Sequence, residues 1–214
     1  MPHLFQVKDL AYEVADKEIL KDIQLIVNQG EDVVISGPSG SGKSTLLKLL
    51  GSLLTPTAGQ LTFEGRPIKD IEPTEYRKAV SYCFQNPQLF GETVKDNLVF
   101  PYEIRQQTFD EERSLLLLEQ IGLSADFLTQ PINGLSGGEK QRVGLIRHLQ
   151  IMPKVLLLDE VTSALDRQSS LVVRAFLKKI QKDHQLTLIR VTHVQEEIEQ
   201  ATRLVKVVSG RIVE

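Results

Sequence analysis

Hydrophobic positions along the chain recur with two different periods, which predict alternating strands and helices. Near the N-terminus, alternation of apolar and polar residues indicates strands at 4–14 and 18–28, joined by the polar stretch Ala15-Asp16-Lys17. The residues 155–159 form a short, almost wholly apolar run, as expected for a strand covered on both faces. Other strands are predicted at 32–36, 60–64, 80–84, 186–192 and 204–208.

Apolar residues spaced three and four apart predict the helices between these strands. The predicted helices are 43–54, 73–79, 92–104, 109–121, 139–152, 167–182 and 195–201. Because strands and helices alternate, we expect an α/β fold with a mostly parallel sheet and helices on both of its sides. The first two strands predict an N-terminal antiparallel β subdomain, and the helix-rich stretch at about 88–147 predicts an inserted α-helical subdomain. We expect one domain over 1–214.

Composition narrows the class of protein. The chain has 214 residues, of which 41% are hydrophobic and 25% charged, values typical of an ordinary globular domain. A net charge of −3 and the lack of any Lys/Arg run argue against nucleic acid as a partner. One cysteine, Cys83, cannot form an internal disulfide and suits a reducing compartment. We see no signal peptide and no apolar run near the ~20 residues that span a bilayer, so another chain would supply any membrane path.

A glycine-rich segment after the 32–36 strand carries the clearest chemistry. The sequence from Gly37 to Ser44, Gly-Pro-Ser-Gly-Ser-Gly-Lys-Ser, matches the phosphate-binding pattern G-x-x-x-x-G-K-[ST] and opens a predicted helix. Glycines allow backbone N–H groups to curl around an anion, and a helix N-terminus attracts negative charge. Lys43 would neutralise the outer phosphates, and the Ser44 hydroxyl would ligate Mg²⁺, which favours oxygen ligands. The nucleotide-binding residues expected here are Gly37, Pro38, Ser39, Gly40, Ser41, Gly42, Lys43, Ser44 and Thr45.

Two carboxylates, Asp159 and Glu160, stand where the apolar 155–159 strand ends. Ligands of open α/β sheets gather at this edge. We predict that Asp159 holds Mg²⁺ and that Glu160 orients or deprotonates an attacking water, a role worth ~10²–10⁴ in rate. An apolar strand followed by Asp-Glu is also common in ordinary loop junctions, so this interpretation depends on the neighbouring phosphate loop.

A second anion-binding pattern lies inside the helical insertion. In Leu135-Ser136-Gly137-Gly138-Glu139, Ser136 and Glu139 have the spacing of a capping box, which alone explains a helix start. The two adjacent glycines cost backbone entropy, however, and expose amides beside the positive end of a helix. A hydrolase with one nucleotide needs one cradle, so we predict that Ser136, Gly137 and Gly138 cover the γ-phosphate held by another copy of the chain.

The order of these motifs resembles the ABC (ATP-binding cassette) family of ATPases. The segment Leu135–Glu139, continued by Lys140-Gln141-Arg142, matches the family's signature, and Ser163-Ala164-Leu165-Asp166 and His193 follow at the family's positions. The resemblance spans nearly the whole chain. It implies a P-loop NTPase core of the RecA-like type, ATP and Mg²⁺ as ligands, and hydrolysis of ATP to ADP and phosphate.

The resemblance also assigns residues whose own chemistry is ambiguous. Gln85 resembles the residue that senses Mg²⁺ and the γ-phosphate, and His193 resembles the switch histidine, although each alone would be read as an ordinary strand-end residue. Tyr12 resembles the aromatic that stacks on adenine; otherwise it is a half-buried strand residue. Asp166 resembles the loop residue that meets the opposite subunit.

The resemblance further implies partners. We expect a head-to-tail homodimer with ATP, peripheral at the cytoplasmic face of the inner membrane beneath an integral membrane permease subunit. The stretches 80–83, 89–101 and 147–154 resemble a subgroup that includes bacterial iron-export and plant aluminium-tolerance cassettes. His148 departs from the wider family, which has alanine there, so packing behind the signature helix should differ.

Two other classes of protein also contain a phosphate loop. A soluble ABC ATPase acting on ribosomes or DNA usually carries two cassettes or a long coiled-coil arm, and this chain has one phosphate loop and no heptad arm. A phosphate-loop kinase or GTPase would leave the Leu135–Glu139 segment without a purpose, and the sequence has no convincing Asn-Lys-x-Asp guanine selector.

Overall fold

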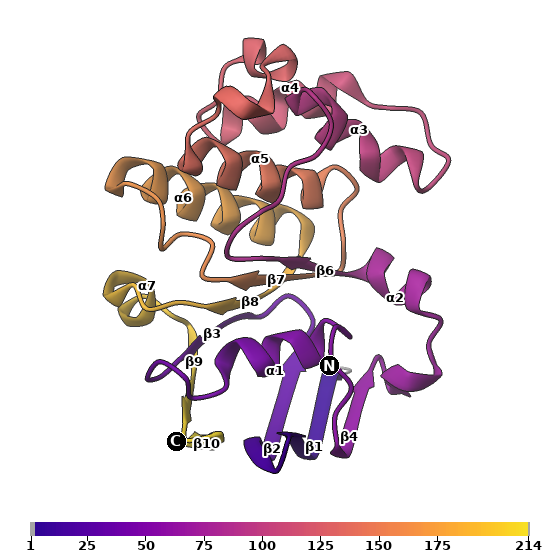
Figure 1. Cartoon of the computed structure of the whole chain (residues 1–214), viewed down its shortest axis with the longest axis vertical. Coiled ribbons are helices and arrows are strands. Elements are labelled where there is room, and N and C mark those ends of the chain that lie inside the picture. The colour runs from indigo at the N-terminus through magenta and orange to yellow at the C-terminus, as the bar shows by residue number, and fades with distance from the viewer. Residues whose placement is uncertain (1–2, 214) are drawn as a thin grey trace.

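The computed structural model describes residues 3–213 and arranges them around two sheets. An antiparallel sheet has the strand order β2-β1-β4-β5, and a six-stranded sheet has the order β10-β9-β3-β8-β7-β6 (Figure 1). The first sheet comprises β1 (His3–Val14), β2 (Lys17–Asn28), β4 (Ala58–Phe63) and β5 (Arg66–Pro67). The second comprises β3 (Asp32–Ser36), β6 (Val80–Cys83), β7 (Val155–Asp159), β8 (Thr187–Val191), β9 (Arg203–Val208) and β10 (Arg211–Val213). Its neighbours pair in parallel except in the β9–β10 hairpin.

Strand β7 shows why the six-stranded sheet must be covered on both faces. Val155 and Leu157 pack into one hydrophobic cluster, and Leu156 and Leu158 pack into the other. All four are at most 2% exposed. Because successive strand residues point to opposite faces, an apolar run of this kind requires cover on each side. The prediction of a doubly covered parallel strand is confirmed.

Helices cover the two faces differently. On the face toward the antiparallel sheet lie α1 (Lys43–Leu50) and α2 (Pro73–Ala79), whose side chains join the first cluster. The opposite face carries α3 (Val94–Glu103), α4 (Glu111–Gln120), α5 (Gly137–Leu149) and α6 (Arg167–His184) (Figure 1). Helix α7 (Gln195–Glu199) follows β8, and short 3₁₀ turns occupy Ile68–Asp70, Ala125–Thr129 and Ile132–Gly134. This is the predicted fold class, a mostly parallel core with an antiparallel N-terminal sheet and a helical portion.

Helices α1 and α5 end well before the positions that their apolar spacing predicts. Helix α1 stops at Leu50 rather than at residue 54, because Gly51 caps it and Ser52 adopts a left-handed φ of 53°. Helix α5 runs from Gly137 to Leu149 rather than over 139–152; Gln150 is its C-cap, and Pro153 follows shortly after. Within residues 3–213 no helix combines the length and the apolar character that crossing a membrane requires.

Candidate nucleotide and hydrolysis site

The predicted catalytic residues gather at one edge of the six-stranded sheet. Strands β3, β8, β7 and β6 are adjacent and parallel, so their carboxyl ends meet at the same edge. Strand β3 leads into the phosphate loop after Ser36, and β8 leads to His193. Strand β7 leads to Glu160, and β6 leads to Gln85. Residues far apart in the sequence thereby come together.

The phosphate loop has a backbone that its glycines alone permit. Gly42 caps α1 with a φ of 102°, and an added Cβ there would lie 2.7 Å from Leu20 Cδ2. A Cβ on Gly37, whose φ is 144°, would lie 1.9 Å from the Val207 carbonyl oxygen. These positions therefore accept no side chain, and the loop closes tightly against β2 and β9. Inside it, the buried Ser41 Oγ finds no hydrogen-bond partner among the described residues.

Lys43 lies along this loop. Its Nζ donates to the carbonyl oxygens of Gly37 at 3.0 Å and Pro38 at 2.8 Å. Burial lowers the pKa of the ammonium group, and the carboxylates of Glu160 and Asp159 oppose that shift. The lysine is thus a partly desolvated cation held at the loop, facing two carboxylates.

Asp159 is fixed through both carboxylate oxygens. Ser44 Oγ donates to Oδ1 at 2.8 Å, and the Tyr82 hydroxyl donates to Oδ2 at 2.7 Å. Burial, reinforced by the hydrogen bond and the charge of Asp159, raises the pKa of Tyr82, so its hydroxyl remains a donor. Ser44 and Asp159 present the oxygen donors that Mg²⁺ prefers, and they lie in contact with each other, so the residues fit the ion.

Glu160 stands beside them with both of its oxygens engaged. Gln85 Nε2 donates to Oε2 at 3.0 Å, and His193 Nε2 lies 3.0 Å from Oε1. Glu160 itself has a left-handed φ of 51°, and its amide donates to the Val191 carbonyl oxygen at the end of β8. The structure therefore brings all three residues predicted to be catalytic into one cluster.

The segment Leu135–Glu139, called here the Ser136 segment, lies at the N-terminus of α5 and not beside the phosphate loop. The predicted capping box is present: Ser136 Oγ accepts from the Glu139 amide at 3.3 Å, and the Glu139 carboxylate accepts from the Ser136 amide at 2.7 Å. Ser136 and Gly137 are exposed. Because α5 and α1 pack on opposite faces of the sheet, their N-termini do not form one cradle within the chain (Figure 1).

Tyr12 and Asp166 occupy the flanks of the site. Tyr12 on β1 is half-buried and pairs with Leu20, the residue that abuts Gly42 of the phosphate loop. Asp166 is exposed and caps α6, where its carboxylate accepts from the Ser169 amide at 3.0 Å. Hydrogen bonding to Ser169, through its side chain first and its amide second, lowers the pKa of Asp166. Tyr12 thus lies close to the phosphate loop, and Asp166 has a structural role within the chain.

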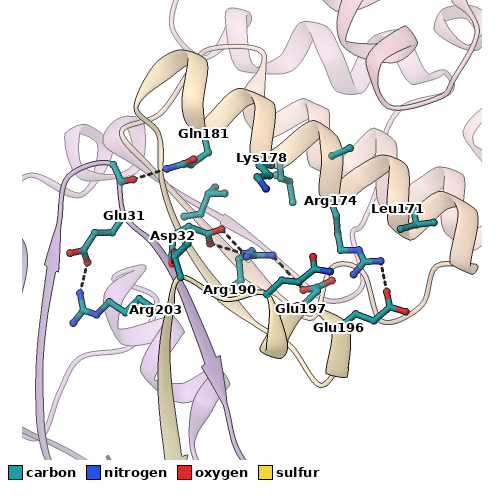
Figure 2. A pocket seen from close by; sticks show the side chains of 16 residues that line it. Glu31, Asp32, Leu171, Arg174, Lys178, Gln181, Arg190, Glu196, Glu197 and Arg203 are labelled. Carbon is teal, nitrogen blue, oxygen red and sulfur yellow. Dashed lines mark hydrogen bonds and ion pairs between the residues drawn. The ribbon is translucent and has the colours of Figure 1, made fainter.

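A network of charged residues adjoins the site, and no local pattern in the sequence predicts it. Thr162 Oγ1 donates to the buried Glu197 carboxylate at 2.7 Å, and Arg190 lies 3.5 Å from the other oxygen of Glu197. Arg190 also makes a bidentate pair with Asp32, at 2.9 and 2.8 Å. Asp32, Arg190 and Glu197 border a cavity of about 720 Å³ between α6, α7 and the sheet (Figure 2). The network ties the loop after Glu160 to α7, which directly follows His193.

A second hollow lies between β6 and α3. It has a volume of about 250 Å³ and is lined by Leu53, Tyr82, Phe84, Phe100, Ile104, Arg77, Arg105, Arg147 and His148, among others. None of the residues in 3–213 that line it is acidic. Four of its apolar side chains are 39–59% exposed. We call this hollow the β6–α3 groove. His148 bonds Ser81 Oγ through Nδ1 at 2.8 Å, and burial together with Arg147 lowers the pKa of His148 to about 3.

The fold and the residues at the sheet edge define a phosphate-loop NTPase. Comparison with known proteins identifies the family within this class. The family model described as ABC transporter matches residues 20–163. The chain is 46% identical over 202 residues to the probable iron export ATP-binding protein FetA of Escherichia coli K12, covering 94% of this chain and 90% of that protein. It is 39% identical to the methionine import ATP-binding protein MetN 1 of Pseudomonas syringae pv. syringae, covering 94% and 63%.

Solved structures support the same family assignment. A dimeric ATP-binding cassette in a post-hydrolysis state with ADP and Pi superposes with a TM-score of 0.88 at 29% identity, covering 98% of this chain and 97% of that one. The chain therefore belongs to the ABC transporter family. It is the ATP-binding, ATP-hydrolysing subunit of such a transporter.

Proposed function

We propose that the sheet edge hydrolyses ATP with Glu160 as general base. The phosphate loop would bind the phosphates through its amides and Lys43, and the orphaned Ser41 hydroxyl is a further donor inside that cradle. Glu160 would take a proton from the attacking water, while Gln85 and His193, which already contact its carboxylate, would position it. Tyr12 would stack on the adenine.

We propose that Ser44 and Asp159 hold Mg²⁺, with Gln85 near it. Their contact at 2.8 Å supports this assignment, because both groups supply hard oxygen ligands. When bound, the ion would neutralise charge on the phosphates. The protein's own part is to keep the Asp159 carboxylate oriented, which Ser44 and Tyr82 do in this structure.

We further propose that two copies pack head to tail, each covering the other's ATP with its Ser136 segment. The observation that carries this proposal is that the two amide clusters lie on opposite faces of one sheet. The capping box serves the Glu139 amide and leaves the Gly137 and Gly138 amides to solvent or a ligand. Asp166 would meet the opposite subunit near this contact.

The dimer is tested with Ser136→Asp in a Glu160→Gln background that slows turnover. Aspartate is as good an N-cap as serine, so α5 should survive, but its charge should repel a γ-phosphate. ATP-driven dimerisation, measured by light scattering, should be lost while ATP binding to the monomer persists. Ser124→Asp adds the same charge to another exposed N-cap position of the helical portion and should dimerise normally. Unchanged dimerisation of Ser136→Asp would refute the contact in trans.

For the membrane partner, we propose that the β6–α3 groove receives a segment of an integral membrane permease subunit. Exposed Phe84, Phe100 and Ile104 offer apolar contact. Because the groove contains three arginines, we expect the segment to carry at least one carboxylate that pairs with them. Ile104→Arg should abolish co-purification with that subunit. Leu116→Arg is the matched control, because Leu116 is similarly exposed at 56% but lies outside the groove on α4. If both variants recovered equal amounts of the membrane subunit, the docking site would not be the β6–α3 groove.

We propose iron export as the transport reaction, on the 46% identity to the probable iron exporter's subunit. Cells that express the chain with its membrane partner should accumulate less iron than cells that express the Glu160→Gln variant with the same partner. A change in methionine uptake without a change in iron content would contradict the proposal.

A further inference from the structure

Tyr82 contributes both to the β6–α3 groove and to the contacts of Asp159. Its ring lines the β6–α3 groove, and its hydroxyl donates to Asp159 Oδ2 at 2.7 Å. The residue is only 7% exposed, so its ring and hydroxyl have little freedom to move separately. The groove and the proposed metal ligand are therefore joined by one rigid side chain.

At the Asp159 end, the hydroxyl satisfies an oxygen that has little access to water. Asp159 is 7% exposed, and its other oxygen is taken by Ser44. Removing the Tyr82 hydroxyl would leave Oδ2 without this donor and would free the carboxylate to rotate. A group that orients a metal-binding carboxylate in this way changes metal affinity although it never touches the ion.

At the groove end, the ring is wedged between two neighbours. Its centroid lies 4.7 Å from that of Phe84, at an angle of 57° between the rings. On another side, a Cβ added to Gly51 would come within 3.0 Å of Tyr82 Cδ2, so the end of α1 leaves no spare space there. Phe84 is 50% exposed. A segment that moves Phe84 would therefore change the packing on the Tyr82 ring, and with it the position of the hydroxyl.

We propose that Tyr82 is a positioning residue that links the occupancy of the β6–α3 groove to the orientation of the Asp159 carboxylate, and so to the affinity of the site for Mg²⁺. The proposal rests on the assignment of Asp159 to Mg²⁺ made above. It provides a route from the groove to the metal ligand that is separate from Gln85, which contacts Glu160 instead.

The first experiment measures binding rather than turnover. Tyr82→Phe keeps the ring and removes only the donor. Titration of Mg²⁺ into the isolated chain with a non-hydrolysable ATP analogue should show a loss of roughly tenfold in apparent Mg²⁺ affinity. Affinity for the analogue in the presence of a chelator should not change. The matched control is Tyr76→Phe, which removes another buried hydroxyl, one that donates to the Leu50 carbonyl oxygen away from Asp159. Equal Mg²⁺ titrations for Tyr82→Phe and the parent chain would overturn the proposal.

The second experiment tests the link to the groove. Phe84→Ala should also weaken Mg²⁺ binding, whereas Phe100→Ala, which removes a groove side chain that packs edge to face against Phe90 instead, should not. In the Tyr82→Phe background, Phe84→Ala should add nothing, because the connection is already cut. Additive effects, or no effect of Phe84→Ala on the parent, would overturn the link.

These outcomes are separable from failure of the proposed function. If Mg²⁺ did not enhance nucleotide binding by the parent chain, or if Asp159→Asn left the Mg²⁺ titration unchanged, the metal assignment itself would be wrong. Co-purification of Ile104→Arg tests the docking of the membrane subunit independently, since every measurement on Tyr82 uses the isolated chain.

Discussion

Replacement of Glu160 by glutamine tests the chemical step most directly. The substitution keeps the shape of the side chain and one acceptor oxygen, so contacts to Gln85 or His193 can persist. It removes the basic carboxylate. General-base catalysis is worth ~10²–10⁴ in rate, which corresponds to about 3–5 kcal/mol of activation free energy. We therefore expect hydrolysis at saturating ATP to fall by that factor.

Binding should respond in the opposite direction. Glu160 contributes negative charge close to Lys43, the residue that we propose binds the phosphates. Removing that charge should leave ATP affinity equal to or tighter than that of the parent, and ATP should accumulate in dimers. The assay is single-turnover phosphate release, combined with equilibrium binding of ATP and sizing of the complex.

A control with the same chemical change separates charge from position. Glu196→Gln removes an exposed carboxylate that pairs with Arg174 on α6, outside the catalytic cluster. It should retain normal turnover. If Glu160→Gln kept more than about a tenth of the parental rate, the assignment of Glu160 as general base would be refuted.

Three further predictions follow from single contacts. Tyr12→Ala should weaken ATP binding roughly tenfold with little loss of turnover at saturation, as a base-stacking aromatic requires; equal ATP affinity in equilibrium titrations would return Tyr12 to a purely structural role. Glu197→Ala should lower the free energy of unfolding by about 2 kcal/mol, because Thr162 loses its buried acceptor and Arg190 keeps only Asp32 as a partner. Glu199→Ala, exposed on the same helix, should not, and coincident denaturation midpoints for the two variants would contradict the role of the network. His148 has a folded-state pKa of about 3 against 6.5 when unfolded, so between these values the unfolded chain binds more protons and stability is lost as pH falls. Lowering the pH from 7.5 to 5.5 should reduce the free energy of unfolding by about 1.4 kcal/mol through this residue. His148→Asn should remove this part of the pH dependence, and His184→Asn should not. Identical pH slopes for His148→Asn and the parent would show that His148 does not titrate as inferred.

Local patterns predicted the elements well, because apolar periodicity reports burial directly. The doubly covered β7 and the capping box at Ser136 could both be read from a few consecutive residues. The early end of α1 could not, since Leu53 continues the apolar spacing while Gly51 and Ser52 stop the helix. Periodicity records which face is buried and not where backbone hydrogen bonds cease.

The contacts among site residues depend on strand order, which no local pattern contains. Gln85, Glu160 and His193 meet because β6, β7 and β8 are neighbours, although α3, α4 and α5 separate β6 from β7 in the sequence. The same holds for Tyr82, which pairs with Leu157, two residues before Asp159 on the same face of β7. Once that register is known, the alternation of side chains places the Tyr82 hydroxyl near Asp159. Glu197 gave no signal, because an acidic residue in a short, mostly charged helix reads as exposed.

The contacts of Glu160 suggest how hydrolysis is tied to assembly. Gln85 and His193 each contact one of its oxygens, so the positions of these two residues decide from which side a water can reach the carboxylate. Gln85 leads to Pro87, which packs so closely on α5 that a Cβ on Gly144 would lie 2.6 Å from it. Helix α5 begins at Ser136, so a γ-phosphate of the opposite copy that pulled on Ser136 would move Gln85 through rigid packing. We therefore expect Gly144→Val, which separates Pro87 from α5, to leave ATP binding intact and to uncouple dimer closure from hydrolysis; a variant whose hydrolysis still rose with dimerisation as in the parent would disprove this route.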